Sequence, residues 1–211
     1  MNISHEHKLI WLSPEMSGTE NVSKTLEKHG FLGVDGKTEE QLFEEYPTYK
    51  VICGMKNPYE RVFLLHFEGD LRSIQLKKHH FEGLKTEFND WGRKILIPKK
   101  LKIKVDETFI NTNNTTKYLK KWGFDYKIPD FFVKSEDLIN DLNKLGFHDD
   151  DIIIDDEVKQ FNFNQMYDFD FAKRVYHLYK KHFYLCDYNP FSFTEKELTD
   201  EEKISFLHDI V

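Results

Sequence analysis

The 211-residue chain contains little cysteine, alanine or arginine. Its two cysteines, Cys53 and Cys186, exclude a disulfide-rich scaffold and a four-cysteine zinc site. As free buried thiols they fit a reducing compartment. No stretch approaches the roughly 18 consecutive apolar residues of a membrane span, and residues 1–8 carry His and Glu where a secretory signal has a basic start and an apolar run. The sequence therefore predicts a cytoplasmic protein with no membrane span.

Acidic residues outnumber basic ones, 37 Asp and Glu against 30 Lys and Arg, so the formal net charge is −7. Binding to nucleic acid or to an anionic membrane requires a basic face, so neither partner is expected. Lysines are dense between Lys94 and Lys104, where a solvated strand edge and a surface for an anionic acceptor are both open interpretations. The acidic stretch 149–157 lacks the glycine and the ligand spacing of a calcium loop, so we predict no metal site.

Aromatic residues are plentiful, with 19 Phe, 10 Tyr and 3 Trp, and each buries a large area, so a core can be built from few side chains. Ser135 is expected to cap a helix that stops at Gly146, and Thr199 with Glu202 forms a capping box. Strands that alternate with helices predict one α/β domain over residues 1–211, with a central, mainly parallel sheet flanked by helices. The pattern predicts strands at residues 8–12, 49–53 and 131–134, and helices at 20–29, from Pro58, at 81–95, 135–146 and 169–183, and from Thr199.

The loop after the first predicted strand has the composition of an anion site. A strand, a small-residue loop and a helix start bring several backbone N–H groups together. The segment from Ser13 to Glu20 has the length of a nucleotide-triphosphate loop, but it lacks the opening Gly, the Lys and the Mg²⁺-binding hydroxyl. We therefore predict a P-loop-like strand–loop–helix without ATPase or kinase activity. Taken alone, the loop also fits an ordinary turn between strand and helix.

Four segments in order resemble the PAPS-dependent sulfotransferases, where PAPS is 3′-phosphoadenosine-5′-phosphosulfate. The stretch Lys56-Asn-Pro-Tyr-Glu-Arg61 departs only at its first position from the family's Arg-Asn-Pro-x-x-Arg. Residues 14–19, Pro-Glu-Met-Ser-Gly-Thr, look like its Pro-Lys-x-Gly-Gly-Thr-Ser loop. Residues 130–141 resemble its strand followed by Glu-x-Leu, and residues 175–188 resemble its closing helix and aromatic stop. The resemblance spans residues 8–188 and implies the family's fold.

The resemblance implies transfer of a sulfuryl group from PAPS without a metal ion, and it assigns the cofactor-binding positions. In the first loop these are Glu15, Ser17, Gly18, Thr19 and Glu20, of which Glu15 stands where the family has its catalytic lysine. For the 3′-phosphate they are Lys56, in place of an Arg, and Leu64, in place of a Ser, with Arg61 one turn before Leu64. Lysine keeps the charge but loses the bidentate fork of arginine.

The general base is open among several residues. Many members of the family place a histidine between the first helix and the second strand, and the best-matching stretch puts Lys37 at that position. Glu39 and His29 are the neighbouring candidates, because other branches of the family use a Glu as base. Further options are Glu40, His66, His79 and His80.

Two functions follow from these residues. The first is a sulfotransferase that acts on a hydroxyl or amine acceptor, which can be a carbohydrate, a peptide or a small molecule. The second is a degenerate homologue that keeps the fold and works as a binding or structural module, because the Lys, the Arg and the Ser are all replaced. In either case the missing contacts predict weak binding of 3′,5′-ADP, with a dissociation constant on the order of 10 µM or higher.

Overall fold

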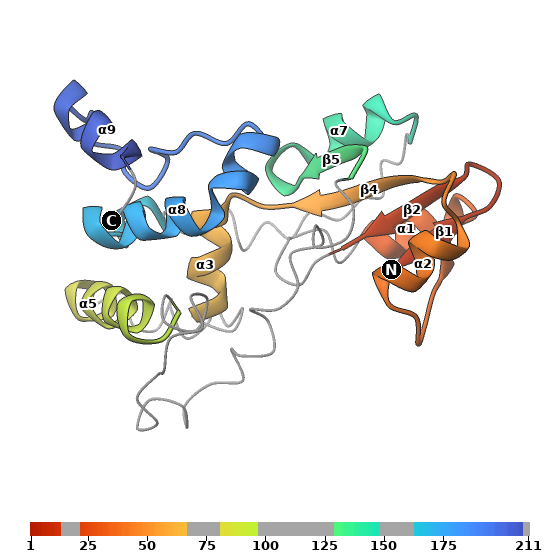
Figure 1. Ribbon diagram of the computed structural model, residues 1–211, viewed down its shortest axis with the longest axis horizontal. Coiled ribbons are helices and arrows are strands. Elements are labelled where there is room, and N and C mark those ends of the chain that lie inside the picture. The colour runs from red at the N-terminus through yellow and green to blue at the C-terminus, as the bar shows by residue number, and fades with distance from the viewer. Residues whose placement is uncertain (14–21, 67–80, 97–128, 148–162, 209–211) are drawn as a thin grey trace. The chain divides into compact units, whose positions relative to one another are not determined.

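The computed structural model in Figure 1 describes residues 1–13, 22–66, 81–96, 129–147 and 163–208. The chain divides into two compact units. Unit 1 comprises Met1–Lys56 and Lys120–Asp155, and unit 2 comprises Asn57–Leu119 and Asp156–Val211. The single domain expected over residues 1–211 stays a prediction, because two such units can belong to one domain.

Unit 1 contains a five-stranded sheet with the order β3-β1-β2-β4-β5. β4 pairs in parallel with both β2 and β5, whereas β1 is antiparallel to both of its neighbours. The three predicted strands are therefore confirmed as the parallel part, but the sheet is mixed rather than mainly parallel. The strands are β1 (Asn2–Ser4), β2 (Leu9–Leu12), β3 (Leu32–Gly33), β4 (Lys50–Met55) and β5 (Phe131–Lys134).

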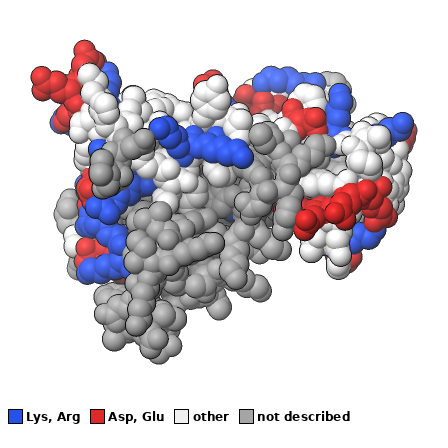
Figure 2. Space-filling view, in the orientation of Figure 1, with Lys and Arg blue, Asp and Glu red and all other residues white. Residues whose placement is uncertain are grey.

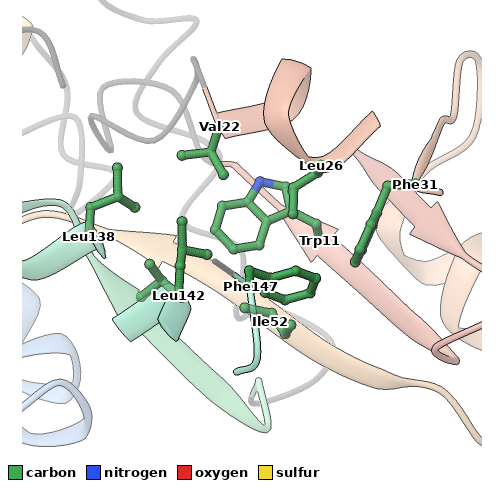
Figure 3. Packing of buried hydrophobic residues seen from close by; sticks show 9 residues of the cluster. Trp11, Val22, Leu26, Phe31, Ile52, Leu138, Leu142 and Phe147 are labelled. Carbon is green, nitrogen blue, oxygen red and sulfur yellow. The ribbon is translucent and has the colours of Figure 1, made fainter. Parts of the chain in front are cut away.

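One face of the sheet carries the core of unit 1. β2 and β4 are apolar and buried apart from their first residues, as is typical of strands in a parallel sheet. Their side chains Trp11 and Ile52 pack against helices α1 (Val22–Lys28) and α7 (Leu138–Lys144), as Figure 3 shows. Phe31 and Phe147 complete this cluster. Both α1 and α7 lie within the helices that the sequence predicts.

The start of α7 differs from the prediction. Residues Ser135–Asp137 form a short 3-10 turn, and the N-cap of α7 is Asp137, which makes no side-chain capping bond. Ser135 therefore caps no helix. Instead, Asp141 in the first turn of α7 reaches back, and its Oδ2 accepts a hydrogen bond of 2.9 Å from the backbone N of Lys134. Gly146 ends the segment with φ of +87°, a conformation suited to glycine, as expected.

Helix α2 (Glu39–Glu45) is not among the helices that the sequence predicts, although its start signal is present. The hydroxyl of Thr38 accepts from the backbone N of Gln41, and the side chain of Gln41 accepts from the backbone N of Thr38. This is a capping box. The helix buries Leu42, half-buries Phe43 and otherwise presents polar side chains.

Unit 2 is helical in its described part. Its helices confirm the predicted ones, including the capping box of Thr199 with Glu202. The core is aromatic: the rings of Tyr167 and Phe171 lie 5.3 Å apart, and both contact Phe88. The helices are α3 (Pro58–His66), α5 (Phe81–Trp91) with a π-helical turn at Gly92–Leu96, α8 (Phe169–Leu185) and α9 (Asp200–Leu207).

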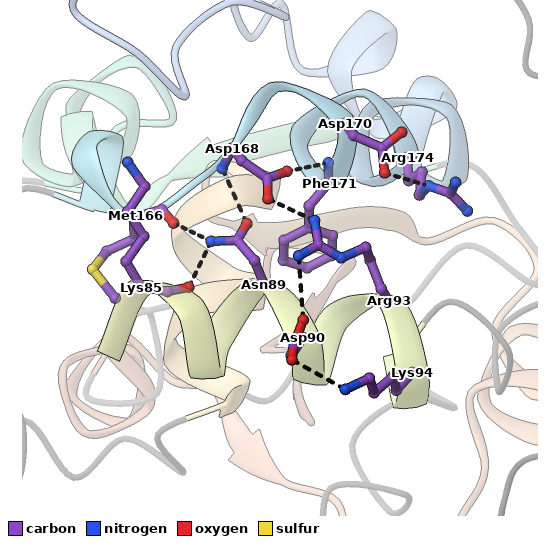
Figure 4. A network of polar contacts seen from close by, with 10 residues as sticks. All are labelled: Lys85, Asn89, Asp90, Arg93, Lys94, Met166, Asp168, Asp170, Phe171 and Arg174. Atoms are coloured by element: carbon purple, nitrogen blue, oxygen red, sulfur yellow. Dashed lines mark hydrogen bonds and ion pairs between the residues drawn. The ribbon is translucent and has the colours of Figure 1, made fainter. Parts of the chain in front are cut away.

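A polar network joins α5 to the start of α8 within unit 2 (Figure 4). The buried Asn89 side chain donates to the backbone oxygens of Lys85 and Met166, both at 2.7 Å, and accepts from the backbone N of Asp168 at 3.0 Å. Asp168 also caps α8 and pairs with Arg93 at 2.6 Å. Asn89 therefore pairs with backbone groups of α5 and of the start of α8, and the bond to Met166 is buried.

We expect Asn89→Ala to lower the free energy of unfolding by about 2 kcal/mol, because it leaves buried backbone groups unpaired. Asn140→Ala is the matched control, since Asn140 also lies in a helix but is exposed, with its amide donating to Asp137. That change should stay within about 0.5 kcal/mol of wild type. Urea unfolding followed by circular dichroism measures both values, and equal losses would contradict a structural role for the network.

Candidate functional site at the carboxyl edge of the parallel strands

The three parallel strands of unit 1 end side by side. Leu12 of β2 lies opposite Cys53 of β4, and Met55 of β4 lies opposite Lys134 of β5. Ligands in open α/β sheets bind at the carboxyl ends of such strands. We call this place the carboxyl edge and define it by the residues at and after the strand ends, which are Ser13, Lys56, Lys134 and Ser135.

The connections of the sheet also diverge at this edge. The chain leaves β2 through α1 toward β3, which lies beyond β1 on one side of the sheet. The chain that leaves β4 returns as β5, on the other side. A crevice forms where neighbouring strands send their connections in opposite directions, and that is the usual ligand position of this architecture. The strand order therefore places the switch point between β2 and β4.

Lys56 follows β4 at this edge and is 5% exposed. Burying an ammonium group costs free energy unless anionic or hydrogen-bonding groups compensate the charge. The position that the sequence assigns to a phosphate contact is therefore a charged residue with little access to water. That environment strengthens its interaction with an anion.

Ser135 follows β5 at the same edge and is 9% exposed. Its Oγ makes no hydrogen bond with any of the residues that the structure describes. A buried hydroxyl without a partner costs about 1–3 kcal/mol, so this group is suited to donate to a ligand oxygen. The sequence signal for such a role is the position directly after a predicted strand, whereas the prediction made Ser135 a helix cap.

The first-loop residues Glu15, Ser17, Gly18, Thr19 and Glu20 lie outside the described residues. The flanking elements are described, with β2 ending at Leu12 and α1 beginning at Val22. A strand, a connection and a helix therefore follow one another as expected. The P-loop-like conformation of the connection stays a prediction.

Arg61 and Leu64, the other two predicted cofactor ligands, belong to α3 in unit 2 and are 2% and 6% exposed. Leu64 is one of the apolar residues that this helix buries. Arg61 acts on a neighbour within unit 2: burial raises the pKa of Tyr179, and the positive charge of Arg61 opposes that rise. Packing thus explains Leu64, and the role of both residues in binding a cofactor stays a prediction.

Two of the predicted catalytic residues, His29 and Lys37, lie at the opposite end of the strands. His5 and His7 belong to the turn between β1 and β2, at the amino edge of the parallel strands. His29 contacts Phe147 with ring centroids 5.5 Å apart, and Phe147 contacts His7 at 6.4 Å. The ammonium of Lys37 lies 5.9 Å from the ring of Tyr46, which contacts His5 at 5.3 Å.

The length of β4 separates these residues from the carboxyl edge. Its six residues span about 17 Å, at about 3.3 Å per residue. The structure therefore does not bring His29 or the Lys37 ammonium next to Lys56. No proton transfer to a group at the carboxyl edge follows from either position.

Lys37 also has the wrong protonation state for a base. It pairs with Glu45, and this hydrogen bond raises the pKa of Lys37 and lowers the pKa of Glu45. An ammonium group donates protons and does not accept them. Glu39, the third predicted catalytic residue, lies in the first turn of α2, the helix that ends with Glu45. Figure 2 shows acidic side chains gathered over α2, to which Glu39, Glu40, Glu44 and Glu45 contribute.

The remaining candidate histidines lie elsewhere. His66 ends α3 in unit 2 and contacts the ring of Trp91 at 4.8 Å, whereas His79 and His80 lie outside the described residues. Within the described ranges, no three His, Cys, Asp or Glu side chains gather as a metal site. No helix in the described part of the chain is long and apolar enough to cross a membrane.

Comparisons of this chain with protein-family models, with curated proteins and with solved structures find no match. The candidate site therefore rests on the residues of the carboxyl edge and on the four sequence motifs.

Proposed function

We propose that the carboxyl edge of unit 1 binds PAPS and that the chain transfers its sulfuryl group to a hydroxyl or amine. One observation carries this proposal. Of the four segments that resemble the sulfotransferases, residues 14–19 and 56–61 follow β2 and β4, and residues 130–141 contain β5; these are adjacent parallel strands that end at one edge. A buried lysine stands there at the position of the family's phosphate contact.

The chemistry requires little of the protein beyond placement and charge. Sulfuryl transfer moves SO₃ in line from a phosphate leaving group to the acceptor, so the enzyme mainly positions the partners and stabilises charge as it spreads, as in phosphoryl transfer. Lys56 supplies a positive charge for a phosphate of the cofactor. The Ser135 hydroxyl supplies a hydrogen-bond donor, and the backbone of the first loop is assigned to the 5′-phosphosulfate by the resemblance alone.

A binding or structural module is the second candidate, and a specific observation favours it. His29 and the Lys37 ammonium lie at the amino edge of the strands, and the length of β4, about 17 Å, separates them from the carboxyl edge. A site that holds the nucleotide without either of these residues beside the acceptor lacks the general-base contribution assigned to them, which favours binding over turnover.

The test is calorimetric titration of 3′,5′-ADP into wild type and into Lys56→Met. Methionine fills a similar volume without the charge, so we expect at least about tenfold weaker binding from the loss of one charged contact. Lys50→Met is the matched control, because Lys50 begins the same strand at its amino end and is exposed. That variant should bind as wild type does, and equal affinities of all three proteins would refute the proposed site.

Incubation with PAPS separates the two candidates. An enzyme releases 3′,5′-ADP and produces a sulfated acceptor when sugars, peptides or small amines and phenols are supplied, which mass spectrometry detects. If the chain is a binding module, 3′,5′-ADP raises its thermal unfolding temperature, and PAPS stays intact with every acceptor class. If Lys56→Met kept both the turnover of PAPS and the stabilisation by 3′,5′-ADP that wild type shows, the nucleotide would bind elsewhere.

A further inference from the structure

Unit 2 contains a cavity of about 470 Å³ that the proposed function does not use. It lies between the start of α8, the segment before α9 and the first two turns of α9. Its walls include three aromatic side chains, Tyr167, Phe169 and Phe193. A cavity of this size and lining accommodates a small organic molecule.

The aromatic walls are held in place by packing. Phe193 is 3% exposed and stacks on the buried Phe206, with ring centroids 5.1 Å apart and an angle of 8° between the planes. Phe169 contacts both rings, at 6.3 Å from Phe193 and 5.4 Å from Phe206. Tyr167 is 5% exposed, and its hydroxyl donates to the backbone oxygen of Tyr59 at 2.6 Å. These rings offer a preformed apolar surface that need not rearrange to bind.

Among the side chains that line the cavity, two carboxylates, Glu201 and Glu202, stand against one ammonium, Lys196. Lys196 pairs with Glu202 at 3.3 Å, and Glu202 also accepts from the backbone N of Thr199 at 2.8 Å. Both charges are therefore engaged with each other. The Glu201 carboxylate makes no hydrogen bond or ion pair with the residues that the structure describes, so its charge is not offset within this part of the chain.

The charges around α9 also decide against an anionic ligand. The first turn of α9 holds Asp200, Glu201 and Glu202, which already offset the partial positive charge of the helix start. Figure 2 shows acidic side chains gathered over this helix. A ligand with a positive charge is attracted by the Glu201 carboxylate, and the aromatic lining suits the apolar body of an organic cation.

We infer that this cavity binds a small organic amine, with an aromatic or alkyl body against Phe169 and Phe193 and its ammonium group beside Glu201. The inference is independent of the carboxyl edge, because every residue that carries it belongs to unit 2.

Tryptamine is the probe, and 3-indolepropionate is its matched counterpart with the same ring and the opposite charge. We expect saturable binding of tryptamine to the full chain at about 1 mM or below, and much weaker binding of the acid, by chemical-shift titration. Equal binding of both compounds, or no saturable binding of tryptamine, would overturn the inference.

Two variants locate the amine. Glu201→Gln should weaken tryptamine binding about three- to fivefold, as expected for one exposed charge pair. Asp200→Asn makes the same change of charge in the same helix turn, but Asp200 does not line the cavity, and its side chain is 96% exposed. Asp200→Asn should bind tryptamine with the affinity of wild type. Equal weakening in both variants would mean that the net charge of the helix, and not a contact with Glu201, attracts the amine.

A third variant fills the cavity. Ser205 lines it, and its backbone oxygen, not its side chain, accepts from Lys173 Nζ at 2.5 Å. Ser205→Trp should therefore keep the circular dichroism spectrum of wild type and abolish tryptamine binding. Binding that survives in the folded variant would show that the amine sits elsewhere.

Discussion

Unit 2 is expected to lose stability steeply when the pH rises above about 10, the ordinary pKa of tyrosine. Burial raises the pKa of Tyr59, Tyr167 and Tyr179, all of which lie in unit 2. The hydroxyls of Tyr59 and Tyr167 donate to backbone oxygens at 2.7 and 2.6 Å. An ionised phenolate has no proton to donate, so these bonds exist only in the neutral form.

The sign follows from the unfolded chain, which ionises first. Below about pH 10 the three phenols are neutral in both states, and their contribution to stability is complete. As the pH rises through the ordinary pKa and toward the raised values, the unfolded state loses protons that the folded state keeps. Each tyrosine then removes about 1.4 kcal/mol per pH unit from the free energy of unfolding, or about 4 kcal/mol for the three together.

Urea unfolding at a series of pH values between about 8 and 12 measures this slope, with phenolate absorbance recorded in parallel. Tyr179→Phe should reduce the slope by about a third, because it removes one of the three groups. Tyr184→Phe is the control: Tyr184 lies in the same helix but is 86% exposed, so its removal should leave the slope unchanged. Ionisation of all the tyrosines near pH 10 before any unfolding would contradict the burial argument.

The elements that sequence patterns predicted are those with long apolar runs or strong helix signals. β5 begins and ends at the predicted residues 131 and 134, and α8 extends the predicted helix 169–183 by two residues. β1 and β3 were missed because three and two residues are too few to show a periodicity, and because their pairing joins Asn2 to Gly33 across the chain. Their antiparallel addition is what makes the sheet mixed.

The candidate site was predictable only in part. Lys56 belongs to a motif that can be read along the chain, and the structure gives it the burial expected of a residue at the end of an inner strand. Ser135 was misassigned, because its buried and unpartnered state depends on the 3-10 turn that replaces a regular helix start. Lys37 looked available because its partner, Glu45, is brought near only when α2 forms.

The second prediction concerns Gly92, at the start of the π-helical turn after α5, and it follows from the packing around this residue. A Cβ atom at this position would lie 1.9 Å from Cζ of Phe171, with two further ring atoms within 2.5 Å. The ring cannot move aside cheaply, because Phe171 is fully buried and contacts Phe88 and Tyr167, both at 5.3 Å. Glycine is therefore required here by the close approach of an aromatic ring.

We expect Gly92→Ala to lower the free energy of unfolding by about 3 kcal/mol, because overpacking of a dense core forces backbone or side-chain shifts. Gly83→Ala is the matched control in α5, since a Cβ there meets nothing within 4 Å. In that exposed helical position alanine should instead stabilise by up to about 1 kcal/mol. Urea unfolding of the two variants should thus give changes of opposite sign from the same substitution. Equal stability of the two variants would contradict this packing. Phe171 could then not lie against the backbone of Gly92, and α8 would have to pack differently on the end of α5.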